Sequence, residues 1–144
     1  MRATINGVRI AIVALFFYWV LLFFGTHIPP DSKLLAQVHQ NDKIIHALAF
    51  TGLSFLMAWA IPTDKARLHK NVLYAAVASV AYAAIDELLQ IPVGRTADFN
   101  DFAADCIGVC VGLAFYTVAR AVMIKAAWKI LTIPESESSK GSQV

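Results

Sequence analysis

The sequence predicts an all-α integral membrane protein, a four-helix bundle with its N- and C-termini in the cytoplasm. The chain of 144 residues is 58% hydrophobic and only 15% charged, whereas soluble domains carry about 25% charged residues. A soluble domain of this size could not bury so much apolar surface. Four long apolar segments are separated by short polar ones, and spans of about 17–25 residues fit a bilayer core about 30 Å thick. The length suits one domain.

The first span is predicted over residues 10–26, which contain no charged side chain and are rich in Phe, Leu and Val. A cleaved signal peptide is the alternative. Its apolar core usually has about 7–15 residues and ends at a small-x-small cleavage site. This segment is longer than such a core, and no small-x-small site precedes Pro29 and Pro30. We therefore interpret it as a transmembrane helix that the two prolines end.

The other three spans are predicted over residues 44–61, 71–89 and 100–128. A short surface helix is expected at 32–40, before the second span, and a tight Pro/Gly turn separates the third from the fourth. Together, residues 1–128 form one domain. The tail at 129–144 is rich in Ser, Glu, Lys and Gly, a composition with nothing to bury, so we expect it to be flexible and cytoplasmic.

The distribution of lysine and arginine predicts the topology. Eight of these residues lie in the N-terminus, the loop at 63–70 and the C-terminal region, against three in the other two loops. Because basic residues favour the cytoplasmic side, both termini are predicted to lie there, in the plasma (inner) membrane. The small net charge of +2 does not indicate nucleic-acid binding. The oligomeric state cannot be deduced.

A polar cluster is expected at the outer face, within residues 86–112. Asp98, Asp101 and Asp105 have the i, i+3, i+7 spacing of one helix stripe. The third span contributes Glu87 and Gln90 at the same level, and the second contributes Asp42 and His46. Ionisable groups beside hydrocarbon are costly and usually functional.

Structural explanations exist for part of this cluster. His46 alone would suit a hydrogen bond between helices, and Asp98 would suit a helix N-cap, with Asp101 in the first helical turn. Arg95 would suit an interface anchor paired with a carboxylate. Glu87 and Asp105 lie a turn or more inside the membrane helices, where an ion needs a partner, so for these two we favour a functional role.

Gly108 and Gly112 form a Gly-x-x-x-Gly motif, which lets two membrane helices approach closely. We expect it to pack the fourth helix against the third, near Tyr82, Ala83 and Ala84. Cys106 and Cys110 also lie four residues apart and are interpreted as small packing residues.

The order and spacing of these residues resemble the VanZ-like family of small bacterial membrane proteins over about residues 10–125. The pattern is Asp-Lys-x-x-His at 42–46, Glu87-x-x-Gln90, Arg95-x-x-Asp98-x-x-Asp101-x-x-x-Asp105, and the two glycines. Asp105 departs from it, because many relatives have Asn there. The family's named member is associated with low-level resistance to the glycopeptide teicoplanin, which implies a role in the cell envelope.

Two hypotheses of different classes follow. In the first, the protein is an enzyme acting on a phosphate-bearing lipid or lipid-linked glycan at the outer face. Arg95 would clamp the phosphate, carboxylates would hold Mg²⁺ or Mn²⁺, and His46 or Glu87 would act as general acid or base. The residues assigned are His46, Glu87 and Asp101 for catalysis, Lys43, Gln90, Arg95 and Asp98 for substrate binding, and Glu87, Asp98, Asp101 and Asp105 for metal binding.

In the second hypothesis, the protein is not catalytic and binds an envelope precursor or a partner protein. The same charges would then form an ion-pair network, with Arg95 paired to Asp98 or Asp101 and His46 paired to Glu87. A small carrier is a third and weaker interpretation, since four helices leave little room for alternating access. Whether the protein is an enzyme stays open at this point.

Overall fold

The computed structural model describes residues 4–5, 8–27, 42–61, 67–94 and 96–131. Two two-residue strands, β1 (Thr4–Ile5) and β2 (Val8–Arg9), form a short antiparallel ribbon before the bundle. Four α-helices and one 3-10 turn follow: α1 (Ile10–Thr26), α3 (Asp42–Ala60), α4 (Leu68–Gln90), η3 (Ile91–Val93) and α5 (Phe99–Leu131). The all-α membrane bundle is confirmed. The expected helix at 32–40, Arg95 and residues 132–144 lie outside the described residues.

Helices α3, α4 and α5 are each long and apolar enough to cross a membrane. The remaining helix, α1, has 17 residues, which is at the lower end of the range for a span. Helix α5 continues to Leu131, three residues beyond its expected end. The helices therefore match the predicted apolar segments closely.

Large apolar side chains cover the outside of the bundle, and several alanines are among the most buried residues of its interior. Phe17, Leu21 and Leu88 are each more than 60% exposed, while Ala58, Ala75 and Ala83 are fully buried. This distribution suits lipid as the surrounding solvent, because helices pack there by close approach of small residues.

The closest helix pair is α3 with α5, and two glycines of α5 make it possible. A Cβ atom at Gly108 would overlap the carbonyl oxygen of Ala47, and one at Gly112 would overlap that of Thr51. The hydroxyl of Thr51 also donates to the carbonyl oxygen of Gly108, 3.1 Å away. The expectation that this motif packs against the third span is wrong, because it packs against the second.

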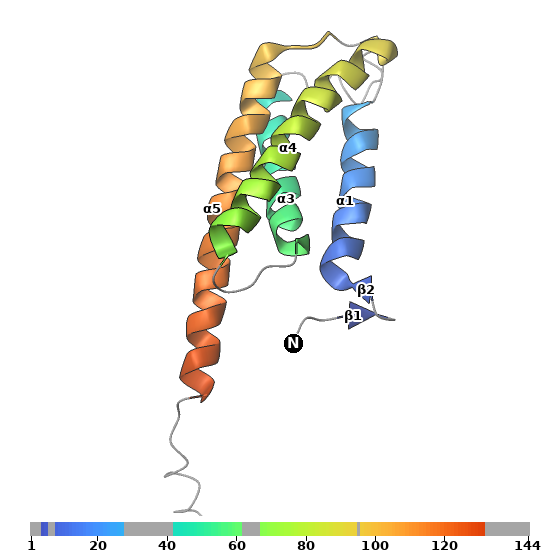
Figure 1. Cartoon of the computed structure of the whole chain (residues 1–144). Coiled ribbons are helices and arrows are strands. Elements are labelled where there is room, and N and C mark those ends of the chain that lie inside the picture. The colour runs from blue at the N-terminus through green and yellow to red at the C-terminus, as the bar shows by residue number, and fades with distance from the viewer. Residues whose placement is uncertain (1–3, 6–7, 28–41, 62–66, 95, 132–144) are drawn as a thin grey trace, which may run out of the picture.

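The connection between α4 and α5 explains this difference. Gly94 adopts a left-handed conformation (φ 85°) that glycine accommodates without strain, and its N–H donates to the carbonyl oxygen of Ile91. Residues 96–98, which belong to no helix or strand, lead from this turn to the start of α5. Figure 1 shows α4 inclined to α5, so the two helices diverge toward this connection while α3 lies along α5.

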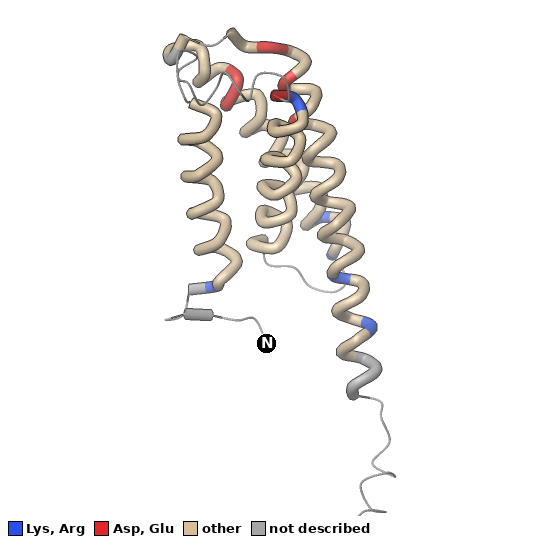
Figure 2. Tube along the Cα trace, turned by 180° about the vertical axis from the view of Figure 1, so that it is seen from behind, with Lys and Arg blue, Asp and Glu red and all other residues tan. Residues whose placement is uncertain are grey.

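Charged residues are segregated between the two ends of the bundle (Figure 2). The described acidic residues lie at the end where α1 and α4 finish and α3 and α5 begin, and Lys43 is with them. At the other end, the Arg9 guanidinium donates to the carbonyl oxygens of Trp59 and Ala60, where the dipole of α3 favours a cation. The remaining described basic residues also belong to that part of the bundle: Arg67, Lys70, Arg120 and Lys125.

Candidate functional site

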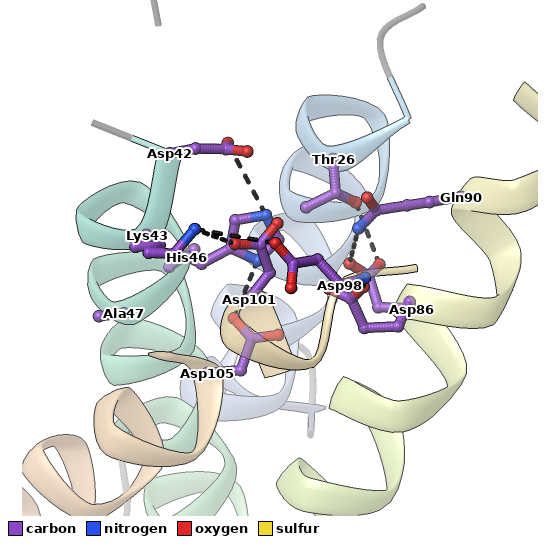
Figure 3. A network of polar contacts seen from close by, with 12 residues as sticks. Thr26, Asp42, Lys43, His46, Ala47, Asp86, Gln90, Asp98, Asp101 and Asp105 are labelled. Carbon is purple, nitrogen blue, oxygen red and sulfur yellow. Dashed lines mark hydrogen bonds and ion pairs between the residues drawn. The ribbon is translucent and has the colours of Figure 1, made fainter. Parts of the chain in front are cut away.

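His46 lies at the centre of the polar cluster, between two carboxylates. It is 3% exposed, and its Nδ1 atom is 3.0 Å from Oδ1 of Asp105 on α5. Its Nε2 atom is 3.9 Å from Oδ1 of Asp42, one turn earlier on α3. Figure 3 shows the two carboxylates on different sides of the imidazole. His46 is therefore hydrogen-bonded to Asp105, and among the described residues no hydrogen bond or ion pair joins it to Glu87, the partner that the network hypothesis expected.

Glu87, on α4, is the residue that the third helix of the site contributes next to His46. Its Oε2 atom accepts a hydrogen bond from the backbone N–H of Asp98, 2.9 Å away, while its Oε1 atom is buried without a partner among the described residues. Asp105 has the same property, because its Oδ2 atom is also buried and unpartnered there. One potential ligand atom from each of His46, Glu87 and Asp105 lies within 4.8 Å of the others.

Lys43 links the site to the start of α5. Its Nζ atom is 3.3 Å from Oδ1 of Asp101 and 3.8 Å from Oδ2 of Asp98. The Lys43 side chain is 57% exposed, whereas that of Asp101 is 10% exposed. Asp101 also lies in a second group of potential ligands with Asp42 and His46. Lys43 thus provides positive charge at the exposed side of the cluster.

Asp98 is the N-cap of α5. Its Oδ1 atom accepts hydrogen bonds from the backbone N–H of Asn100 at 2.8 Å and from the Asn100 amide at 2.9 Å. The backbone hydrogen bond is the main reason why the pKa of the Asp98 carboxyl lies below its usual value. The capping interpretation of Asp98 is confirmed, and Asp98 joins neither group of potential metal ligands.

A second polar cluster, centred on Asp86, was not predicted from the sequence. Asp86 is fully buried, and its Oδ1 atom accepts hydrogen bonds from the hydroxyls of Thr26 (3.0 Å) and Tyr82 (3.4 Å). Gln90, which we had assigned to substrate binding, donates its amide to Oδ2 of Asp86, 3.0 Å away. The i, i+4 spacings of Tyr82, Asp86 and Gln90 were the sequence signal for this cluster.

A pocket of about 240 Å³ adjoins the site and is lined by Ala84, Glu87, Ala97, Asp98, Phe99 and Phe102. Its walls are mostly apolar, with the two carboxylates as the polar groups. The pocket therefore places Glu87 beside a surface that suits an amphipathic molecule.

The structure gathers most of the predicted site residues, in a different grouping. His46, Glu87 and Asp105 form one group, and Asp101 and Lys43 lie next to it. Gln90 belongs to the Asp86 cluster, and Arg95 lies outside the described residues. Of the four carboxylates predicted to share a metal, Glu87 and Asp105 lie together with His46, and Asp101 lies with His46 and Asp42.

Comparison with known proteins identifies the family of the chain. No curated protein and no solved structure matches the chain. The model of the VanZ/LLP1 family matches residues 10–120, which include α1, α3, α4, the first two thirds of α5 and the polar cluster. The chain therefore belongs to the VanZ/LLP1 family.

Proposed function

We propose that this membrane protein is an enzyme of the bacterial cell envelope that acts on a phosphate-bearing lipid or lipid-linked glycan at the outer face of the plasma membrane. The observation that carries the proposal is the presence of unpartnered carboxylate oxygens on Glu87 and Asp105, close to His46. Each approaches His46, and each keeps one buried oxygen without a partner among the described residues.

A network that served to hold helices together would be expected to satisfy its buried atoms. Leaving a buried acceptor unsatisfied costs about 1–3 kcal/mol, and such groups in native proteins are often catalytic or bind an ion or water. Asp86 is a useful comparison, because both of its oxygens accept hydrogen bonds. Single unpartnered atoms also occur at Asn71 and Ser79. Near His46, two unpartnered oxygens belong to carboxylates that lie close together, which favours chemistry over helix packing.

We assign a role to each residue of the polar cluster from its contacts and exposure. His46, in contact with Asp105, is suited to proton transfer, because the carboxylate orients the imidazole and stabilises its charged form. Glu87 lines the pocket at the end of the bundle and is placed to exchange a proton with a bound lipid headgroup. Asp101 supports the site through Lys43. Lys43 is exposed enough to contact a phosphate, with Arg95 as the proposed second contact.

The alternative, a non-catalytic protein that binds an envelope precursor or a partner, has one observation in its favour. Lys43 and His46 already contact carboxylates across α3 and α5, Lys43 with Asp101 and His46 with Asp105. Such pairs would hold a rigid surface for binding. In that case neutral substitutions would reduce the accumulation of the protein rather than its turnover.

The test uses the full chain purified in detergent and reconstituted in liposomes. It is incubated with polyprenyl phosphates, polyprenyl diphosphates and phospholipids, with and without divalent cations, and products are identified by mass spectrometry. We expect turnover of one class and a loss of about 100-fold or more in His46→Gln and Glu87→Gln, the usual contribution of a general acid or base.

The matched control is Asp86→Asn. This residue precedes Glu87 on the same helix and is equally buried, yet it faces Thr26 and Gln90. An asparagine can keep these hydrogen bonds if the Gln90 amide turns over, so we expect normal turnover. Folded wild-type protein that leaves the whole panel unchanged would contradict the proposal.

A further inference from the structure

We propose that His46, Glu87 and Asp105 form a binding site for one divalent transition-metal ion. Each residue comes from a different helix, α3, α4 and α5, and one potential ligand atom of each lies within 4.8 Å of the others. The inference rests on the same residues as the proposed function, with His46 and Glu87 acting as ligands of the ion rather than as proton donors or acceptors when it is bound. It concerns metal binding alone, so measurements of binding can support or contradict it without any measurement of turnover.

The unpartnered oxygens are the second observation that points to a cation. Glu87 is 6% exposed and Asp105 is fully buried, and Oε1 of Glu87 and Oδ2 of Asp105 have no hydrogen-bond donor among the described residues. Two carboxylates this close repel each other strongly in a medium of low dielectric constant. A divalent ion between them would balance both charges and would be bound by the two carboxylates, each of which has an oxygen without a donor among the described residues.

The spacing agrees with coordination of one ion. Metal–nitrogen and metal–oxygen bonds of about 2.0–2.2 Å place neighbouring ligand atoms roughly 3.0–3.5 Å apart. Nδ1 of His46 and Oδ1 of Asp105 are 3.0 Å apart and share a hydrogen bond, which the bound ion would replace. Small side-chain movements of Glu87 would bring its free oxygen to the same distance.

The second nitrogen of His46 has a suitable outer partner. If Nδ1 binds the ion, Nε2 carries a proton and faces Oδ1 of Asp42, 3.9 Å away. Metal-binding histidines usually donate their other N–H to a carboxylate, which sets the tautomer and the ring orientation. At 3.9 Å the two groups are not hydrogen-bonded, so Asp42 would become this outer partner after a small approach of its carboxylate to Nε2.

The ligand set selects the class of metal. Imidazole nitrogen favours Zn²⁺ and other first-row transition ions, and carboxylate oxygen is compatible with Mn²⁺ as well. Three protein ligands leave a coordination position open, which is the arrangement of catalytic rather than structural sites. The site is thus expected to bind Zn²⁺ or Mn²⁺ more tightly than Mg²⁺ or Ca²⁺, which take oxygen ligands.

The experiment measures binding by the full chain in detergent after treatment with a chelator. Zn²⁺ binding is followed by calorimetry, and Mn²⁺ binding by electron paramagnetic resonance. We expect one ion per chain, with a higher melting temperature that the chelator reverses. Glu87→Gln and Asp105→Asn should weaken binding by about 100-fold or more, and Asp42→Asn by about 10- to 100-fold, the effect of losing an outer partner.

Asp86→Asn is the control and should bind as the wild type does. The absence of stoichiometric Zn²⁺ or Mn²⁺ binding by folded wild-type protein would overturn the inference, and that test needs no variant. Equal weakening by Asp86→Asn would overturn it as well. A loss that follows Asp101→Asn and not Asp105→Asn would assign the ion to the group of Asp42, His46 and Asp101 instead, and would also overturn it.

The two proposals fail in distinguishable ways. Metal binding without turnover of any lipid would leave the metal site standing and remove the proposed function. Turnover that persists after complete removal of metal would leave the function standing and remove a metal requirement. Stoichiometric binding that is lost in Glu87→Gln and kept in Asp86→Asn is the result that supports this site.

Discussion

Two neighbouring carboxylates on α4 have opposite surroundings, although they differ by one position in the sequence. Successive side chains of an α-helix point about 100° apart. Asp86 therefore contacts Thr26 of α1, while Glu87 contacts Asp98 at the start of α5. Hydrogen-bond donors occupy both oxygens of Asp86, whereas one oxygen of Glu87 remains unpartnered among the described residues. At the scale of single residues, Asp86 connects helices, whereas Glu87 keeps the unpartnered oxygen on which the proposed function rests.

The cap residue Asp98 gives a prediction for pH dependence. The hydrogen bonds from Asn100 lower its pKa in the folded protein, so the folded state binds fewer protons than the unfolded state does. The stabilising effect is therefore complete above the unfolded pKa of about 3.9 and is lost as the pH falls through the folded pKa.

We expect Asp98→Ala to lower the melting temperature at pH 7 and to differ less from the wild type in strongly acidic buffer. Asp98→Asn, which can still cap the helix, should be close to the wild type at neutral pH. The check is thermal unfolding in detergent across this pH range. A constant difference between Asp98→Ala and wild type at every pH would contradict the capping role of the charge.

At the scale of helices, small residues determine which pairs approach closely. Gly108 and Gly112 lie directly against the backbone of α3, and the hydroxyls of Thr51 and Ser54 donate to carbonyl oxygens of α5 at 3.1 and 3.2 Å. This close approach sets the depth of Asp105 relative to His46, because both lie one turn or less from the contact. The glycines therefore position the polar cluster without taking part in its chemistry.

Gly112→Ala should destabilise the protein by about 1–3 kcal/mol, the usual cost of overpacking, because the new methyl group would meet the backbone oxygen of Thr51. Gly25→Ala is the matched control. Nothing lies within 4 Å of a Cβ atom at Gly25, and alanine favours the helix by about 0.5–1 kcal/mol there. Unfolding in detergent measures both variants, and similar effects of the two substitutions would contradict this packing.

At the scale of the whole molecule, charge separates the two ends of the bundle. The described acidic residues lie at one end, and Arg9, Arg67, Lys70, Arg120 and Lys125 lie away from it. The N-terminal ribbon and the end of α5 are both on the basic side (Figure 1). Because basic residues favour the cytoplasmic side, we propose that the polar cluster faces outward.

Cysteine labelling tests this orientation. Asn100 and Lys125 are both exposed on α5, and the rise of about 1.5 Å per residue separates them by more than the bilayer core of about 30 Å. In a background with Cys106→Ala and Cys110→Ala, we expect an impermeant thiol reagent to label Asn100→Cys in intact cells. Lys125→Cys should react after the membrane is permeabilised, and the reverse pattern would contradict the proposed topology.

The sequence predicted the helices well, because apolar length is a local property of the chain. Each described helix begins and ends within about three residues of its predicted bounds, as is usual for helix ends. The spacing of Asp98, Asp101 and Asp105 likewise predicted a shared helix stripe. The convergence of His46 and Glu87 on this stripe was expected from their common membrane level, and the distances now show which atoms meet.

The sequence by itself determined the class of the protein and the composition of its polar end, since hydrophobic length and charge distribution act locally. The tertiary structure decided which helices are in contact, and therefore which polar atoms are paired. The inclination of α4 turns Asp86 toward Thr26. The close contact of the α5 glycines with α3 brings Asp105 into hydrogen-bond distance of His46, so that His46 pairs with Asp105 rather than with Glu87. No periodicity specifies these choices, because they depend on the angles between helices and on close packing of their backbones.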